Sequence, residues 1–282
     1  MMTARSTEYE FIEALSSELS QSELVFPTSL NATLKIRNAL NDPDMSTENV
    51  ARILSAEPVV AAQVLRRSNS AMLNRTGARV NDLRTAVLLL GFSAVRNIVI
   101  AVGMKQLTEY KEDEPLAKYL EGLWARSLRV AAWASALARF QRRISPDKAM
   151  MAGLLHDIGK FYILHRARKY QDLFFSEAAL WDLVDQWHTG IGSAILESWD
   201  VDEDIMNAVM DHRVDDLPLS ARPGLTDVLW AADHLDGALH VGTIDWTARP
   251  HALQNLGLDE ESSHALMLET ERELALIREA IG

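Results

Sequence analysis

The segment MAGLLHDIGKFYIL, residues 151–164, is the most informative stretch of this chain. It places His156 and Asp157 side by side in an otherwise apolar helical run, directly before Gly159 and Lys160. Burying an imidazole and a carboxylate among apolar side chains costs free energy unless both are satisfied. The same two groups are suitable ligands for a divalent metal. The pair therefore indicates either a metal site or a hydrogen-bonded pair that holds neighbouring helices together.

The sequence on both sides of this segment has helical rather than strand periodicity. Apolar residues recur at three- and four-residue spacing, and no Asn-Gly or Asp-Gly hairpin turn links the runs. We expect helices over residues 48–55, from Pro58, from a cap at Asn81 or Asp82 to Leu90 with Gly91 as its end, from a cap at Ser93, and over 116–140, 147–164, 188–199, 202–211, 226–239 and 259–281. The sequence predicts an all-α fold without significant sheet.

One charged stretch, Thr108 to Pro115 (TEYKEDEP), is the best candidate for a boundary within this fold. It predicts an N-terminal helical subdomain, residues 1–107, packed on a C-terminal helical bundle, residues 116–282. The chain has only 8 Pro and 13 Gly, and these low counts argue against a flexible string of domains.

Composition restricts the class of protein and its compartment. Of the 282 residues 48% are hydrophobic, which is enough for a substantial core, and the absence of cysteine excludes disulfides and thiolate metal sites. The N-terminus has no apolar signal core, and no uninterrupted apolar run approaches the length of a membrane span. We expect a soluble cytoplasmic protein with no membrane association.

The charge is strongly acidic overall but locally basic. The formal net charge of -12 opposes non-specific binding to nucleic acid. From Arg126 to Lys169, however, ten basic residues accompany only two acidic ones, a local net charge of +8. This bias fits either solvated helix faces or a pocket that attracts an anion such as phosphate.

The motifs of the chain, taken in order, resemble the HDOD family, a branch related to the HD and HD-GYP phosphohydrolases. His156 and the three residues after it resemble the HDIG signature of that superfamily. Upstream, the chain shows Pro27 before a first helix, a DPD turn at 42–44, an "EP…A…VL…NSA" segment at 57–71 and an "AV..LG..AVRN" segment at 86–97. The resemblance covers about 24–240, and it implies one helical HDOD module that stands alone.

The resemblance also implies a set of metal ligands. In the superfamily an upstream histidine, the His-Asp pair and a distant aspartate hold the metal, and the last three match His156, Asp157 and Asp233. Members with two metals use further histidines, which match His188 and His212.

This chain departs from the pattern at two positions. Where the family segment resembles W-x-H-S, it has Arg126 in Trp-Ala-Arg-Ser, and where the family often has two histidines it has His212 followed by Arg213. Arginine has no lone pair for a metal, and its fixed charge repels a cation. The remaining ligands form a vestigial or partial site. We expect Arg126 to pair with Asp157 or Asp233; as an alternative, it could take a phosphate.

Three functions are compatible with these residues. The favoured one is a non-catalytic bacterial regulatory module, a pseudoenzyme in signal transduction that acts through an unknown signalling protein or a small ligand. The second is a metal-dependent phosphohydrolase acting on nucleotides or cyclic dinucleotides. The third is a sensor that binds a nucleotide or other anion, through Arg126, Lys160 and Arg213, without hydrolysing it. No cofactor is expected for the first, although the partial site could hold a divalent metal.

Overall fold

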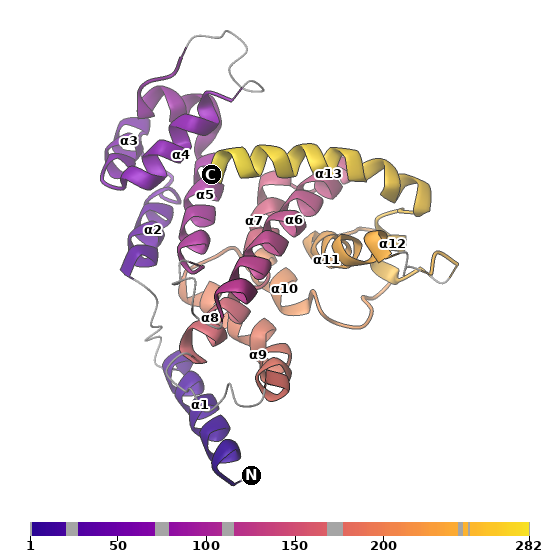
Figure 1. The fold of residues 1–282 in the computed structure, drawn as a ribbon. Coiled ribbons are helices and arrows are strands. Elements are labelled where there is room, and N and C mark those ends of the chain that lie inside the picture. The colour runs from indigo at the N-terminus through magenta and orange to yellow at the C-terminus, as the bar shows by residue number, and fades with distance from the viewer. Residues whose placement is uncertain are drawn as a thin grey trace.

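The computed structural model describes residues 2–20, 28–70, 79–108, 116–167, 177–241, 245–247 and 249–281. Every regular element in these ranges is a helix, which confirms the all-α prediction (Figure 1). The helices are α1 (Met2–Ser20), α2 (Thr28–Ala39), α3 (Thr47–Ser55), α4 (Pro58–Ser68), α5 (Leu83–Gln106), α6 (Ala117–Gln141), α7 (Pro146–Leu155), α8 (Ile158–Ala167), α9 (Glu177–Ser198), α10 (Glu203–Asp211), α11 (Leu225–Val241), α12 (His251–Asn255) and α13 (Glu260–Ile281).

Local signals determine several of the helix ends. The side chains of Ser46 and Asp82 each accept a hydrogen bond from the backbone N–H three residues on, so both act as N-caps. Gly91 lies inside α5 with φ 78° and ψ 160°, a conformation that glycine adopts without steric cost. The chain therefore breaks its helical path at the residue where the sequence predicts a helix end, although α5 continues beyond it.

Two predicted ranges are wrong. The helix expected over 147–164 is divided by a turn at His156 and Asp157, where the Asp157 carbonyl accepts the N–H of Lys160 at 2.9 Å to begin α8. Helix α9 begins at Glu177, eleven residues before the predicted start at 188. Its first half buries Leu180, Leu183 and Val184 at helical spacing, a periodicity that the surrounding polar and aromatic residues conceal.

The N-terminal half has its own core. Helices α2 to α5 bury a cluster of aliphatic side chains that includes Ile36, Val50, Leu54, Val64 and Val99. Helix α1 lies apart from this cluster, at the lower end of the molecule in Figure 1, and packs Phe11 and Leu15 into the C-terminal core. The division at 1–107 and 116–282 stays a prediction, because most of the predicted boundary lies outside the described residues.

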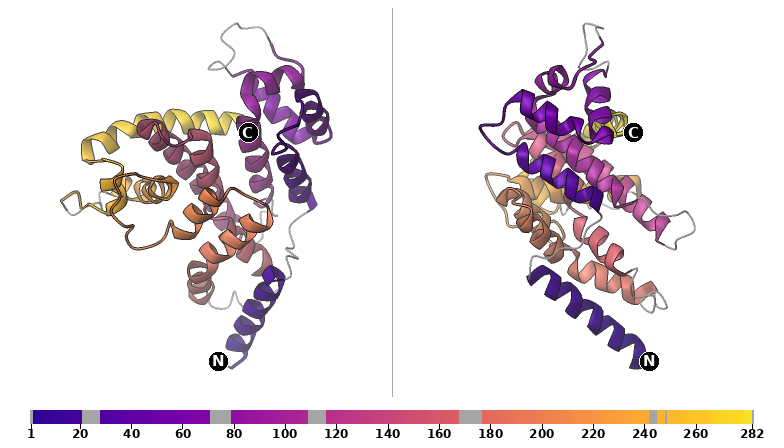
Figure 2. Two further views of the ribbon diagram at one scale, coloured as in Figure 1. Left: turned by 180° about the vertical axis from the view of Figure 1, so that it is seen from behind. Right: turned by 90° about the vertical axis from the view of Figure 1, so that its left-hand side faces the viewer.

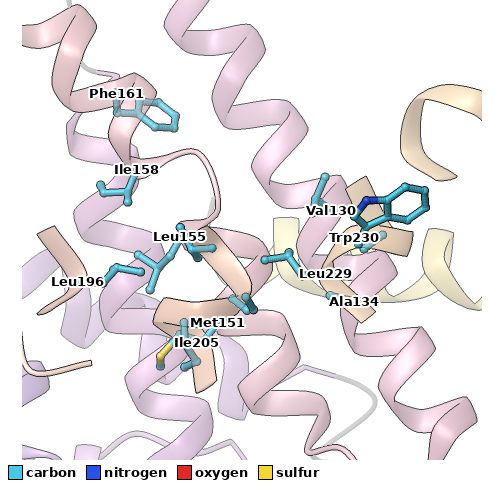
Figure 3. Packing of buried hydrophobic residues seen from close by; sticks show 14 of the residues in the cluster. Val130, Ala134, Met151, Leu155, Ile158, Phe161, Leu196, Ile205, Leu229 and Trp230 are labelled. Atoms are coloured by element: carbon cyan, nitrogen blue, oxygen red, sulfur yellow. The ribbon is translucent and has the colours of Figure 1, made fainter. Parts of the chain in front are cut away.

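The C-terminal half is a bundle around α6 and α7. Side chains from α6 to α11 meet in its core, as the ten residues labelled in Figure 3 show. Helices α6 and α7 approach closely because Gly153 has no side chain: a Cβ there would lie 2.5 Å from Cα of Ala131. Helix α13 crosses the bundle and reaches the N-terminal half beside α4 and α5 (Figures 1 and 2).

One helix in the described part of the chain, α5, is long and apolar enough to cross a membrane. Of its most apolar 18-residue window 56% is buried within the fold, as in the core helix of a globular protein. This helix alone is weak support for a membrane span.

Candidate functional site

The His-Asp pair lies at the centre of the C-terminal bundle, in the turn between α7 and α8. Both side chains are fully buried. In one continuous helix adjacent side chains diverge by about 100°. Here the turn brings both side chains close to a second aspartate, Asp233 of α11: His156 Nε2 lies 3.1 Å from Asp157 Oδ2 and 3.6 Å from Asp233 Oδ1.

Arg126, from α6, contacts all three of these groups. Its Nη1 lies 2.6 Å from His156 Nε2 and 2.8 Å from Asp157 Oδ2, and its Nη2 donates to Asp233 Oδ1. The His156 ring places Nδ1 2.7 Å from the Gly153 carbonyl. In the tautomer that donates to this carbonyl, Nε2 accepts from the arginine. One guanidinium thus occupies the centre of the three side chains that the family resemblance assigns to a metal.

The charges of this cluster stabilise one another. Burial by itself would raise the pKa of Asp157, but His156, Lys160 and Arg126 outweigh it and hold that pKa well below its ordinary value. Burial would also raise the pKa of Asp233, but neighbouring charges, chiefly that of Arg126, outweigh it and lower that pKa. Both carboxyl groups are therefore ionised at neutral pH, and each is paired with the same guanidinium.

His188 of α9 and His212, directly after α10, lie beside this cluster. Both are buried, and their Nδ1 atoms donate to the Val184 and Val209 carbonyls at 2.9 and 2.7 Å. Burial, with smaller contributions from Lys160 and Arg213, lowers the pKa of His188 to about 4. Burial is also the chief cause that lowers the pKa of His212 to about 3. Both rings are therefore neutral at pH 7, and each has a lone pair on Nε2.

One lysine and one arginine that the sequence predicts as anion contacts also bind the two carboxylates of the cluster. Lys160 Nζ lies 3.0 Å from Asp157 Oδ1, and Arg213 Nη1 donates to Asp233 Oδ2 at 3.2 Å. The predicted contacts of Arg126, Lys160 and Arg213 with a phosphate remain a proposal, because in the structure each pairs with a carboxylate.

A second ion pair next to the site was missed in the sequence. Arg129 binds the Asp236 carboxylate with both Nε and Nη2, at 2.8 and 3.0 Å. The two residues follow Arg126 and Asp233 by three positions each, so they lie one turn further along the same two helices. This repeated spacing is the signal that would have predicted the pair.

The residues fit a divalent metal at one position and not at another. At the position bounded by His156, Asp157 and Asp233 the guanidinium of Arg126 already engages the ligand atoms. Beside it, ligand atoms of Asp157, His188 and His212 lie within 4.8 Å of one another. Both Nε2 atoms there are buried without a hydrogen-bond partner among the described residues, and Asp157 Oδ1 has only the Lys160 ammonium.

Fold and site together define an all-helical protein in which a buried His-Asp pair and a second aspartate surround one arginine. The HDOD domain model matches residues 26–214, and the chain belongs to this family. The resemblance expected over 24–240 is therefore confirmed for most of its length.

Solved structures share this fold over nearly the whole chain. A Shewanella amazonensis protein, provisionally assigned as a metal-dependent phosphohydrolase, is 24% identical with a TM-score of 0.71, over 96% of this chain and 99% of that one. An HDOD domain protein of unknown function from Geobacter sulfurreducens is 24% identical with a TM-score of 0.62, over 95% and 96%. At these identities the likeness shows the fold.

One curated relative, an uncharacterised protein of Treponema pallidum, is 24% identical over 213 residues. The match covers 70% of this chain and 40% of that protein, so the chain spans less than half the length of this relative.

Proposed function

We propose that this chain is a non-catalytic regulatory module of bacterial signal transduction, in which Arg126 takes the place of a metal ion. Membership in the HDOD family supports a regulatory module related to the HD phosphohydrolases. A Marinobacter aquaeolei structure with the same fold, provisionally assigned to signal transduction, has a TM-score of 0.64 and 19% identity, over 99% of this chain and 65% of that one. The partner we propose is another cytoplasmic signalling protein.

The observation that carries the proposal is the threefold contact of Arg126. A metal held by His156, Asp157 and Asp233 would have to displace the guanidinium from both carboxylates. Displacement would leave the Arg126 side chain, which is 24% exposed, unpaired beside a divalent ion. The two positive charges would repel each other. The arginine therefore keeps the centre intact as a buried ion-pair cluster and disfavours metal chemistry at that position.

A second candidate, a one-metal phosphohydrolase, is favoured by the neighbouring position. Among the described residues, no donor contacts the buried Nε2 atoms of His188 and His212, and both atoms lie near the Asp157 carboxylate. Such nitrogen and oxygen ligands suit a divalent metal. A metal bound there would supply a water of lowered pKa as a nucleophile. Lys160 opposes this candidate, because its ammonium already lies 3.0 Å from the shared carboxylate.

The third reading, a phosphate at Arg126, has less support. Both terminal nitrogens of this side chain already donate to carboxylates, so an incoming anion would have to compete with Asp157 and Asp233.

The test is metal analysis of protein purified without chelator, followed by assay against cyclic dinucleotides and nucleoside phosphates with added manganese. We expect wild type to show no turnover and no metal at the Arg126 position. The variant Arg126→His restores a ligand there and should retain more metal than wild type. The matched control is Arg129→His, one helical turn away and paired with Asp236, which should leave metal content unchanged.

The second candidate predicts a different result. Wild-type protein would then contain one equivalent of metal that is lost in His212→Gln, with turnover that is lost in Asp157→Ala. Those two findings together would overturn the non-catalytic proposal.

A further inference from the structure

A cavity of about 460 Å³ lies at the junction of the two halves, apart from the Arg126 cluster. Its wall comes from α2 and α5 on the N-terminal side, and from α7, α10 and the connection before α10 on the C-terminal side. Its size is within the range of pockets that hold small ligands. The wall is rich in charged and amide groups.

Arg37, from α2, is the most deeply buried cation of this wall, with 3% of its surface exposed. Its Nη1 donates to the Trp199 carbonyl and its Nη2 to the Asp200 carbonyl at 3.1 Å, so it clamps α2 to the end of α9. Its Nε is buried and has no partner among the described residues. Among the described residues no carboxylate lies within ion-pair distance of this guanidinium, which is costly for a buried charge.

Arg96, from α5, is a second cation on the same wall. It donates to the Leu40 carbonyl and to Ser93 Oγ, each at 3.0 Å, and in the described part of the chain it too has no carboxylate within ion-pair distance. The two guanidinium groups affect each other: burial lowers the pKa of Arg37, Asp200 opposes the decrease, and Arg96 adds to it.

The other charged groups of the wall are largely engaged elsewhere. Lys148 is neutralised by Asp202 at 2.8 Å and Asp204 at 2.6 Å. Asp147 also borders the smaller neighbouring cavity that Arg139 lines, and its charge helps to raise the pKa of Arg139. Apart from Lys148 and its two aspartates, the wall holds Arg37 and Arg96 together with Asp147 and Asp200. These charges balance, but among the described residues neither arginine has a carboxylate within ion-pair distance.

The wall also offers a buried acceptor and two helix N-termini. Asn97 donates from Nδ2 to the Asp147 carbonyl at 3.1 Å, and its Oδ1 is buried without a partner in the described residues. Ser145 and Asp202, the N-caps of α7 and α10, both line the cavity. Helix N-termini carry partial positive charge and favour anions.

We propose that this cavity binds a phosphorylated small molecule of nucleotide size, with its phosphoryl group against Arg37 and Arg96. A phosphate gives the two arginines the anionic partner that they lack, and it offers acceptors in the geometry that a guanidinium fork recognises. The Asn97 oxygen accepts a hydrogen bond from the remainder of the ligand. Because α2 and α5 bind from one side and α7 and α10 from the other, the ligand joins the two halves of the chain.

This inference deepens the regulatory function proposed above, and it does not depend on whether the Arg126 position holds a metal. Its test is calorimetric titration of the full chain with adenosine 5′-monophosphate and, separately, with inorganic phosphate. We expect the nucleotide to bind at least ten times more tightly than inorganic phosphate, because phosphate leaves most of the cavity unfilled.

The discriminating variant is Arg96→Gln, which removes one charge from a partly exposed side chain. Hydrogen bonds to charged groups are strong enough that its loss should weaken nucleotide binding about tenfold or more. The matched control is Arg84→Gln on the same helix α5, exposed and paired with Glu48, which should bind as wild type does. Unchanged circular dichroism and unfolding midpoints would establish that both variants fold.

Three outcomes would overturn the inference: no nucleotide binding by wild type, equal binding of nucleotide and inorganic phosphate, or undiminished binding by folded Arg96→Gln. Binding that is lost in Arg213→Gln instead would place the anion at the Arg126 cluster and would equally refute this cavity. None of these results would alter the metal analysis that tests the non-catalytic proposal.

Discussion

Arg126 Nη1 donates to Asp157 Oδ2 across 2.8 Å, between α6 and the turn that separates α7 from α8. The carboxylate is fully buried, and the same arginine also binds Asp233 of α11. This one side chain therefore compensates two buried negative charges that come from different parts of the bundle. The contact ties these helices together, and in the function proposed above it also disfavours a metal at that position.

We predict that Arg126→Ala lowers the free energy of unfolding by about 3–5 kcal/mol at pH 7, because two buried carboxylates lose their shared partner and keep only Lys160 and Arg213. Arg129→Ala should cost less, because only one buried carboxylate, that of Asp236, loses its guanidinium partner. Urea unfolding measures both values. Equal losses in the two variants would show that the Arg126 cluster has no special role in stability.

We predict a loss of stability as the pH falls from about 6.5 toward 4. The pKa values of His188 and His212 are lowered by burial to about 4 and about 3, so between these values and the ordinary pKa of 6.5 the unfolded chain binds more protons. Their contribution is complete above pH 6.5 and decreases as the pH falls. Asp157 and Asp233, whose pKa values are also lowered, lose their contribution below about pH 4.

The measurement is urea unfolding across this pH range in the presence of a chelator. His188→Gln and His212→Gln should each make the stability curve flatter between pH 6.5 and 4. A curve in either variant as steep as that of wild type would contradict the assignment of neutral rings.

We predict that Gly159→Ala destabilises the bundle by about 1–3 kcal/mol or more. A Cβ at this position would lie 1.9 Å from the carbonyl oxygen of His188, so α8 and α9 would have to separate. Gly190→Ala on α9 is the matched control, since nothing lies within 4 Å of a Cβ there. The control should be neutral or up to about 1 kcal/mol more stable, because alanine favours helix. Thermal unfolding of both variants is the measurement.

We predict opposite effects of alanine at two other helix glycines. Gly91→Ala should cost about 1–2 kcal/mol, because a Cβ is strained at φ 78°. Gly122→Ala, within α6 and with open space around its Cβ, should stabilise the protein by up to about 1 kcal/mol. Denaturant unfolding measures the change in stability of each variant. A stabilising Gly91→Ala would refute the left-handed conformation.

The sequence by itself determined the helical class and several helix ends, because periodicity, N-caps and Gly91 act over a few neighbouring residues. The resemblance to the HDOD family also identified Arg126 as the residue that departs from the family's set of metal ligands. Helix α1 and the first half of α9 were not predicted from the sequence, since their stability comes mainly from packing against the C-terminal core.

Only the tertiary structure decided which partners these residues have. The turn at His156 and the contact of Arg126 with three groups at once depend on how α6, α7, α8 and α11 pack. The same is true of the Arg129–Asp236 pair and of the cavity beside Arg37, whose lining comes from four separate helices and the connection before α10. Electrostatic energies and burial depend on distances in space, and local sequence spacing does not fix those distances.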